Sequence, residues 1–196
     1  MTQARVLADR IIPGEGLAWD VARIGVGNLL LIVCAQLAVP LPWTPVPITG
    51  QTFGVLLVAA LLGARRGAVV TGLYLIEGLL GLPVFQPYGL PGALRLAGPT
   101  AGYLIACPAA AGMTGWIVER ARQMKDGGWL AGLVVALLAG ETVIFVCGWA
   151  WLAKVYGMGT SAALAAGVTP FLAGELIKVS GVAAIVRGTE RVVEKK

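Results

Sequence analysis

Charged side chains are scarce in this sequence. Asp, Glu, Lys and Arg make up 13% of its 196 residues, whereas 58% are hydrophobic. Soluble domains usually carry about 25% charged residues. A soluble fold could not bury this much apolar surface, so the composition predicts a membrane protein. The 28 glycines fit that class, because small residues let membrane helices pack closely.

Histidine is absent, and cysteine is rare. Cys34, Cys107 and Cys147 stand alone inside apolar segments, without the spacing of metal ligands. The chain also lacks the phosphate-binding pattern G-x-x-x-x-G-K-[ST]. We therefore expect no metal, no cofactor and no ATP hydrolysis by this chain. The first 16 residues lack the apolar core and cleavage site of a signal peptide, so the first apolar run is expected to be retained.

Six hydrophobic runs are separated by charges or by proline and glycine clusters. They lie at about 21–39, 51–63, 67–82, 98–118, 128–153 and 169–187. The pattern predicts an all-α membrane protein, a bundle of six transmembrane helices in a single domain over residues 1–196. The second and third runs are short and are split only by Ala64-Arg65-Arg66, so one kinked helix is an alternative. A tight turn is favoured, because two buried arginines without partners would cost several kcal/mol.

The distribution of basic residues predicts the orientation of the helices. If the N-terminus is cytoplasmic, only Arg95 and Lys154 lie in outer loops, and Lys178 lies within a helix. The other twelve of the fifteen fall in cytoplasmic segments, as the positive-inside rule expects. These are Arg5, Arg10, Arg23, Arg65, Arg66, Arg120, Arg122, Lys125, Arg187, Arg191, Lys195 and Lys196. We expect both termini in the cytoplasm and the chain in the cell membrane, in contact with lipid and not with nucleic acid.

This orientation makes the outer connections longer than the inner turns. They span 39–50, 82–97 and 154–169 and are rich in proline and glycine. Long outer loops suit a lid over an outward-facing site.

Ionisable residues inside the apolar runs mark a candidate site, because each costs a few kcal/mol there. The four are Glu77, Glu141, Glu175 and Lys178. Glu175 and Lys178 lie ~7 Å and ~12 Å below Pro170, the expected outer start of the last helix, on one face of it. Glu77 and Tyr103 are expected within the outer half as well. We therefore predict a ligand site there, with candidate residues Glu175, Lys178, Tyr103, Arg95, Glu77, Glu141, Trp43 and Phe171.

Several candidates also fit plainer interpretations. Glu175 and Lys178 together fit a structural ion pair. Tyr103 and Trp43 fit ordinary aromatics of the membrane interface. Glu77 fits a polar pocket or a contact with a neighbouring subunit as well as it fits a ligand contact.

Four segments, between about Ala35 and Lys178, resemble the BioY family, the biotin-specific S components of energy-coupling factor (ECF) transporters. They are AQLAVPLPWTPVPITGQTFGVLLVAALLG, GLYLIEGLLGLPVF, LAGPTAGYLIA and PFLAGELIKV, in this order. The resemblance implies a six-helix fold of the ECF S-component type, with biotin near the outer face, under the first loop and among helices four to six. It also implies that Glu175 and Lys178 contact the ligand; the family usually has aspartate at the position of Glu175. Energy would come from partner ATPase subunits and a coupling transmembrane subunit.

Biotin suits the predicted site chemically. It has a ureido ring with two N–H donors and a carbonyl, an apolar thiophane ring, and a valerate that is anionic at pH 7. An acid can accept the N–H donors, and a cation can bind the valerate or polarise the ureido oxygen. The residues leave open which of these Lys178 does. The aromatic residues expected around the apolar ring are Trp43, Tyr74, Phe85, Tyr103 and Phe171.

Two other functions compete with a biotin-binding transport subunit. One is a stand-alone proton-coupled carrier with Glu141 or Glu77 as its proton site, which uptake by vesicles without ATPase partners would favour. The other is an intramembrane enzyme that uses Glu77, Glu141 or Glu175 as acid or base. The sequence offers that enzyme no H-E-x-x-H, no paired aspartates and no histidine.

Overall fold

The computed structural model describes residues 6–124 and 128–194. Its elements, in chain order, are α1 (Leu7–Ile11), α2 (Leu17–Gln36), strands β1 (Ala38–Val39) and β2 (Ile48–Thr49), α3 (Gln51–Leu79), the 3-10 helix η1 (Gly92–Ala97), α4 (Ala101–Ala121), α5 (Trp129–Ala150), the π-helical turn η2 (Trp151–Val155), α6 (Thr160–Gly167), the 3-10 turn η3 (Thr169–Phe171) and α7 (Leu172–Glu194). In the described ranges the strands form a single short antiparallel pair, β1 with β2. The fold is therefore helical, as predicted.

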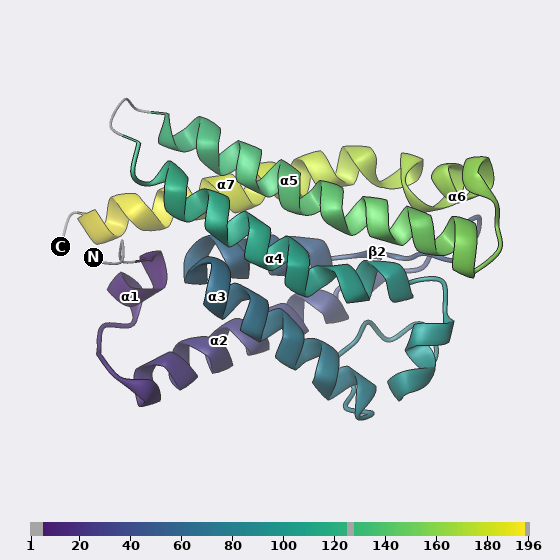
Figure 1. The fold of residues 1–196 in the computed structure, drawn as a ribbon, viewed down its shortest axis with the longest axis horizontal. Helices are drawn as coiled ribbons and strands as arrows, with labels where there is room; N and C mark the ends of the chain where they lie inside the picture. The colour runs from purple at the N-terminus through teal and green to yellow at the C-terminus, as the bar shows by residue number, and fades with distance from the viewer. Residues whose placement is uncertain (1–5, 125–127, 195–196) are drawn as a thin grey trace.

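Five helical segments of the described chain are long and apolar enough to cross a membrane: Leu17–Gln36, Gln51–Leu79, Ala101–Ala121, Trp129–Val155 and Thr160–Glu194. Figure 1 shows α1 and the C-terminal end of α7 at one end of the bundle, and α6 with the strands at the other.

Two differences from the predicted elements have simple causes. α7 continues to Glu194, past the predicted end at 187, because its last turns carry charged residues that do not belong to an apolar run. The predicted outer loop 154–169 contains α6, an alanine-rich segment that favours a helix but is too short to show a period.

α3 folds back on itself at Gly63. This residue has φ 82° and ψ −178°, which is not helical, and a positive φ favours glycine. The hydroxyl of Tyr74 donates to Oε1 of Gln51 at 3.3 Å, although a straight helix would separate the two residues by about 35 Å. The element therefore consists of two antiparallel limbs, 51–62 and 64–79. The reversal lies one residue before the predicted turn.

Helix α4 holds this turn in place. A carboxylate oxygen of Glu119 accepts a hydrogen bond from the backbone N–H of Ala64 at 2.8 Å. Gly115 lies so close to the backbone of Gly63 and Ala64 that a Cβ there would collide with it. The turn is thus fixed by close packing as well as by its own backbone conformation.

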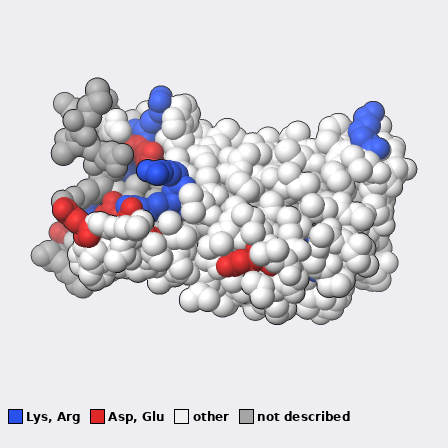
Figure 2. Space-filling model, turned by 60° about the horizontal axis from the view of Figure 1, so that its bottom comes forward, with Lys and Arg blue, Asp and Glu red and all other residues white. Residues whose placement is uncertain are grey.

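An ion-pair network joins the elements at the end that carries α1. Arg66 contacts Asp9 at 2.7 Å and Asp20 at 2.6 Å, and Arg23 contacts the same two carboxylates at 3.4 Å and 3.0 Å. Figure 2 shows charged side chains gathered at this end and an almost uncharged surface beyond it. Of the predicted cytoplasmic residues, Arg5, Lys125, Lys195 and Lys196 lie outside the described ranges.

Side-chain to backbone hydrogen bonds hold the loops at the opposite end. The amide of Gln36 donates to the carbonyls of the segment 83–85 at 2.8–3.1 Å. The hydroxyl of Thr44, in the proline-rich loop, donates to the carbonyl of Ala166 on α6 at 2.6 Å. These bonds hold the connections 39–50 and 82–97 around the space between the helix ends.

The turn at Gly63 provides a test of the fold. We expect Gly63→Ala to destabilise the protein by about 2 kcal/mol, because a Cβ requires an unfavourable positive φ and would collide with Glu119. The midpoint of thermal unfolding in detergent should fall by roughly 4–8 °C. Gly72→Ala is the matched control, since a Cβ there meets nothing within 4 Å. Equal midpoints for the two variants would contradict the strained turn.

Candidate ligand pocket

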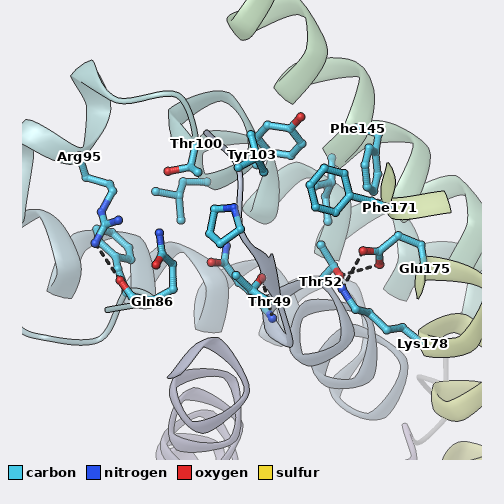
Figure 3. Close-up of a pocket in the computed structure, with 16 residues that line it drawn as sticks. Thr49, Thr52, Gln86, Arg95, Thr100, Tyr103, Phe145, Phe171, Glu175 and Lys178 are labelled. Carbon is cyan, nitrogen blue, oxygen red and sulfur yellow. Dashed lines mark hydrogen bonds and ion pairs between the residues drawn. The ribbon is translucent and has the colours of Figure 1, made fainter. Parts of the chain in front are cut away.

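A pocket opens between the β2 region, the loop before η1, the N-terminal parts of α4 and α7 and the C-terminal half of α5 (Figure 3). It holds about 580 Å³ of space, counted out to its open mouth. That figure includes open solvent; the cavity itself is about 50 Å³, smaller than the roughly 300–1,000 Å³ of typical small-molecule sites, so side chains must move to admit a ligand of that size. The apolar lining is Val46, Pro47, Phe85, Tyr103, Leu104, Ile144, Phe145 and Phe171; the polar lining is Thr49, Gln51, Thr52, Gln86, Arg95, Thr100, Glu175 and Lys178.

Glu175, Lys178 and Thr52 form a closed polar trio at one side of the pocket. Nζ of Lys178 donates to Oε1 of Glu175 at 2.7 Å and to Oγ1 of Thr52 at 3.1 Å. The hydroxyl of Thr52 donates to the other oxygen of Glu175 at 2.8 Å. The predicted ion pair therefore exists, and it also lines the pocket. An ammonium has three donors, so Lys178 keeps one N–H beyond these two bonds.

Local structure explains why these three side chains meet. Glu175 and Lys178 are three residues apart in α7, which places them on the same face of the helix. Thr52 is in the first turn of α3, where the chain leaves β2. The acid is only 8% exposed and the lysine 16%, so both depend on each other and on Thr52 for solvation that water would otherwise supply.

Aromatic rings form the middle of the pocket wall. Tyr103 and Phe145 pack edge to face with centroids 5.9 Å apart, and Phe171 lies 6.3 Å from Phe145. The hydroxyl of Tyr103 donates to the carbonyl of Gly167 at 2.7 Å. A Cβ at Gly148 would collide with the Tyr103 ring, so this glycine permits the close approach of α5 to α4.

Arg95 lies across the pocket from Glu175 and Lys178 (Figure 3). Its guanidinium donates to the carbonyls of Tyr88 at 2.6 Å and Gln86 at 2.9 Å and lies over the Phe85 ring. Its Nε is buried and has no hydrogen-bond partner among the described residues. Burial lowers the pKa of Arg95 from its ordinary value, but a guanidinium stays charged at neutral pH. The side chain thus organises the loop and presents a cation to the pocket.

Three predicted residues do not line the pocket. Trp43 is 69% exposed. The carboxylate of Glu77 accepts a hydrogen bond from Nδ2 of Asn28 at 3.0 Å. Glu141 is buried behind the pocket with neither oxygen hydrogen-bonded in the described chain, within electrostatic reach of Glu175 and Lys178. Of the eight predicted site residues, the structure places Glu175, Lys178, Tyr103, Arg95 and Phe171 in the lining of one pocket.

Several polar lining residues were not predicted from the sequence. Thr49, Gln51 and Thr52 follow the proline-rich loop directly, where an apolar run begins. Polar residues are common at helix starts, and the hydroxyl of Thr49 accepts a hydrogen bond from the backbone N–H of Gln51 at 3.3 Å, so their presence at this boundary is a weak signal. Gln86 and Phe145 carried no local signal, because they reach the pocket only through the tertiary fold.

Comparisons with known proteins show which family the chain is similar to. A family model described as the BioY family matches residues 4–195. The biotin transporter BioY of Rhodobacter capsulatus is 37% identical over 169 residues, which cover 82% of this chain and 87% of the relative. That of Rhizobium etli is 35% identical over 153 residues, 76% of this chain and 81% of the relative.

A solved structure is also similar. The crystal structure of the S-component for biotin from an ECF-type ABC transporter matches with a TM-score of 0.79 and 26% identity, over 91% of this chain and 95% of that chain. The family model spans nearly all of the sequence, and both relatives align over most of it, so the chain belongs to the BioY family.

Proposed function

We propose that this chain is the biotin-binding S component of an ECF-type transporter. It is a multi-pass protein of the plasma membrane that captures biotin for import. The observation that carries the proposal is the pocket itself: an acid–lysine pair on one side, a guanidinium on the other, and aromatic rings between them. Biotin has the same order of groups, with a polar ring at one end and an anion at the other.

The charges of the pocket suggest which way biotin lies. Glu175 is the only acid that lines it in the described chain, and a carboxylate is a strong acceptor for the two ureido N–H groups. The remaining N–H of Lys178 can then reach the ureido oxygen. The valerate would face Arg95, where no acid opposes it. The proposed contacts are thus Glu175, Lys178, Tyr103, Arg95 and Phe171.

Energy for transport would come from other subunits. The sequence has no nucleotide-binding loop, and the similar solved structure is that of an S-component from an ECF-type ABC transporter. We therefore propose that a coupling transmembrane subunit and ATPase subunits complete the transporter.

The membrane topology is part of the proposal. The two limbs of α3 are 12 and 16 residues long, ~18 Å and ~24 Å, and counting each as a crossing gives six. The charged end with α1 and the end of α7 would then face the cytoplasm, and the pocket would face outward. The positive-inside rule supports this orientation.

Replacing the lysine tests the site. Lys178→Ala should weaken biotin binding at least tenfold, or ~1.4 kcal/mol, because Glu175 and the ureido oxygen both lose a charged donor. Isothermal titration of the detergent-solubilised protein measures it, with a panel of other vitamins as a specificity control. Lys154→Ala, at an exposed lysine outside the pocket, should bind like wild type. Unchanged affinity in Lys178→Ala would overturn the site assignment.

The orientation of biotin is tested with its methyl ester. Arg95→Gln should lower the affinity for biotin at least tenfold but change that for the uncharged ester less than threefold, because only the free valerate pairs with the guanidinium. The ratio of the affinities for biotin and for its ester distinguishes pairing of Arg95 with the valerate from a general loss of order in the loop. An equal loss for both ligands would assign Arg95 to the loop alone.

Topology is tested with single cysteines in a variant whose three native cysteines are replaced by alanine. A membrane-impermeant maleimide should label Tyr88→Cys in intact cells, because the loop before η1 faces outward. Arg65→Cys, at the α3 turn, should be labelled only after the membrane is disrupted. Both wild-type side chains are exposed. Labelling of Arg65→Cys in intact cells would rule out six crossings with this orientation.

A further inference from the structure

Beneath the floor of the pocket lies a second layer of polar side chains. Ile144 and Phe145 of α5 line the pocket, and Glu141 comes three and four residues before them, so it lies on the same face about one turn deeper. Cys107 of α4 likewise lies one turn deeper than Tyr103, and its Sγ donates to the carbonyl of that residue at 3.2 Å. Glu141 is therefore under the pocket rather than in its lining.

The carboxyl of Glu141 has no hydrogen-bond partner among the described residues. Glu141 is only 7% exposed, and both of its carboxyl oxygens are buried. Three groups face it from the helices packed against α5: the carboxylate of Glu175 and the ammonium of Lys178 on α7, and the thiol of Cys107 on α4. The first limb of α3 and helix α6 also contact α5, and neither contains a titratable residue. The lysine is therefore the one cation that faces Glu141 in the described chain.

The two acids and the single lysine do not balance in charge. Lys178 already bonds Glu175 at 2.7 Å. If Glu141 were ionised as well, the three groups would carry a net negative charge inside the membrane, which costs several kcal/mol. Two carboxylates have only acceptors and cannot bond each other, whereas a protonated carboxyl has an O–H donor. One proton on Glu141 would therefore supply the missing hydrogen bond and make the group neutral.

We propose that Glu141 is a proton-binding site linked to the ligand pocket: its protonated carboxyl donates to Glu175, and biotin binds to this neutral form. The inference deepens the proposed function and rests on it. Thr52, Lys178 and Glu141 then occupy three of the roughly four lone-pair sites of the Glu175 carboxylate, so at least one site stays open to a ureido N–H.

Loss of this proton weakens ligand binding. An ionised Glu141 attracts the ammonium of Lys178 away from the ureido oxygen and repels the carboxylate of Glu175, so both polar contacts of the ligand shift. Biotin also displaces water from the pocket, and charges beneath it are then screened less. Biotin binding and proton binding therefore favour each other, to the same extent in both directions. The affinity for biotin should fall as the pH rises and Glu141 loses its proton.

Infrared spectroscopy of the full chain in nanodiscs tests the proton without any ligand. The C=O stretch of a protonated carboxyl is separate from the bands of ionised carboxylates, so wild type should show it at pH 7 and lose it reversibly at high pH. Glu141→Gln should lack this band, and Glu141→Asp should keep it at a shifted frequency. Glu77→Gln is the matched control and should keep the band, because Glu77 accepts a hydrogen bond from Asn28 and lies outside the pocket.

Biotin titration across the pH range tests the linkage. Glu141→Gln stays neutral at every pH, so its affinity at pH 6 should be within threefold of wild type, which also shows that it folds. The ratio of wild-type to Glu141→Gln affinity should fall at least threefold between pH 6 and pH 10, and Glu77→Gln should follow wild type. At pH 9 the wild type should take up a fraction of a proton from the buffer on binding, measured from the heats in buffers with different ionisation enthalpies.

The outcomes distinguish this site from the proposed function. A missing band in wild type, or a band that Glu141→Gln retains, would overturn the proton site while biotin binding could still be observed. A constant ratio of affinities would overturn the linkage even with the band present. If wild type shows the band but binds no biotin at any pH, the proton site stands and the proposed ligand is wrong.

Discussion

The structure depends on one constraint: an ion pair placed inside a membrane protein must be solvated by protein groups, because lipid offers none. Glu175 and Lys178 meet it through each other and Thr52. That solution requires the first turn of α3 to lie against α7. The proline-rich loop and the β1–β2 pair directly precede that first turn and bring the chain to it. The position of these elements thus allows Glu175 and Lys178 to be solvated by protein groups.

The same constraint explains why the pocket can bind a polar ligand. In the trio, each oxygen of Glu175 accepts one hydrogen bond and keeps a free lone pair, and Lys178 keeps one N–H, so an entering ligand exchanges its bonds to water for bonds to these groups. Such an exchange favours a ligand with several donors and an acceptor over a merely apolar one. The aromatic rings contribute affinity for an apolar part of the ligand but do not discriminate between ligands with different polar groups. On the proposed function, we expect specificity to lie mainly in the polar trio and in Arg95.

Much of this was predictable from sequence, for reasons that differ between elements. The spanning segments were found because apolar runs are local signals, and Glu175 with Lys178 because an ionisable pair in such a run stands out. The turn was predicted at Ala64-Arg65-Arg66, one residue after Gly63. The positive φ of Gly63 could not be predicted, because a glycine in the sequence is the only local indication of it. Thr52 and Gln86 were missed because their neighbours come from other helices. Glu77 was assigned to the pocket on its depth, and Trp43 as an aromatic residue near the mouth. Depth along a helix fixes how far a residue lies from the surface but not the direction in which its side chain points.

The hydrogen bond between Thr44 and Ala166 has a kinetic consequence. It joins the proline-rich loop to α6, the first part of the segment Thr160–Glu194. The β1–β2 pair at the base of the loop and the buried side chain of Val46 hold the same loop. Loss of the Thr44 bond would therefore loosen the loop without releasing it, so we expect this bond to affect the rate at which a ligand enters and leaves more than its fit inside the pocket.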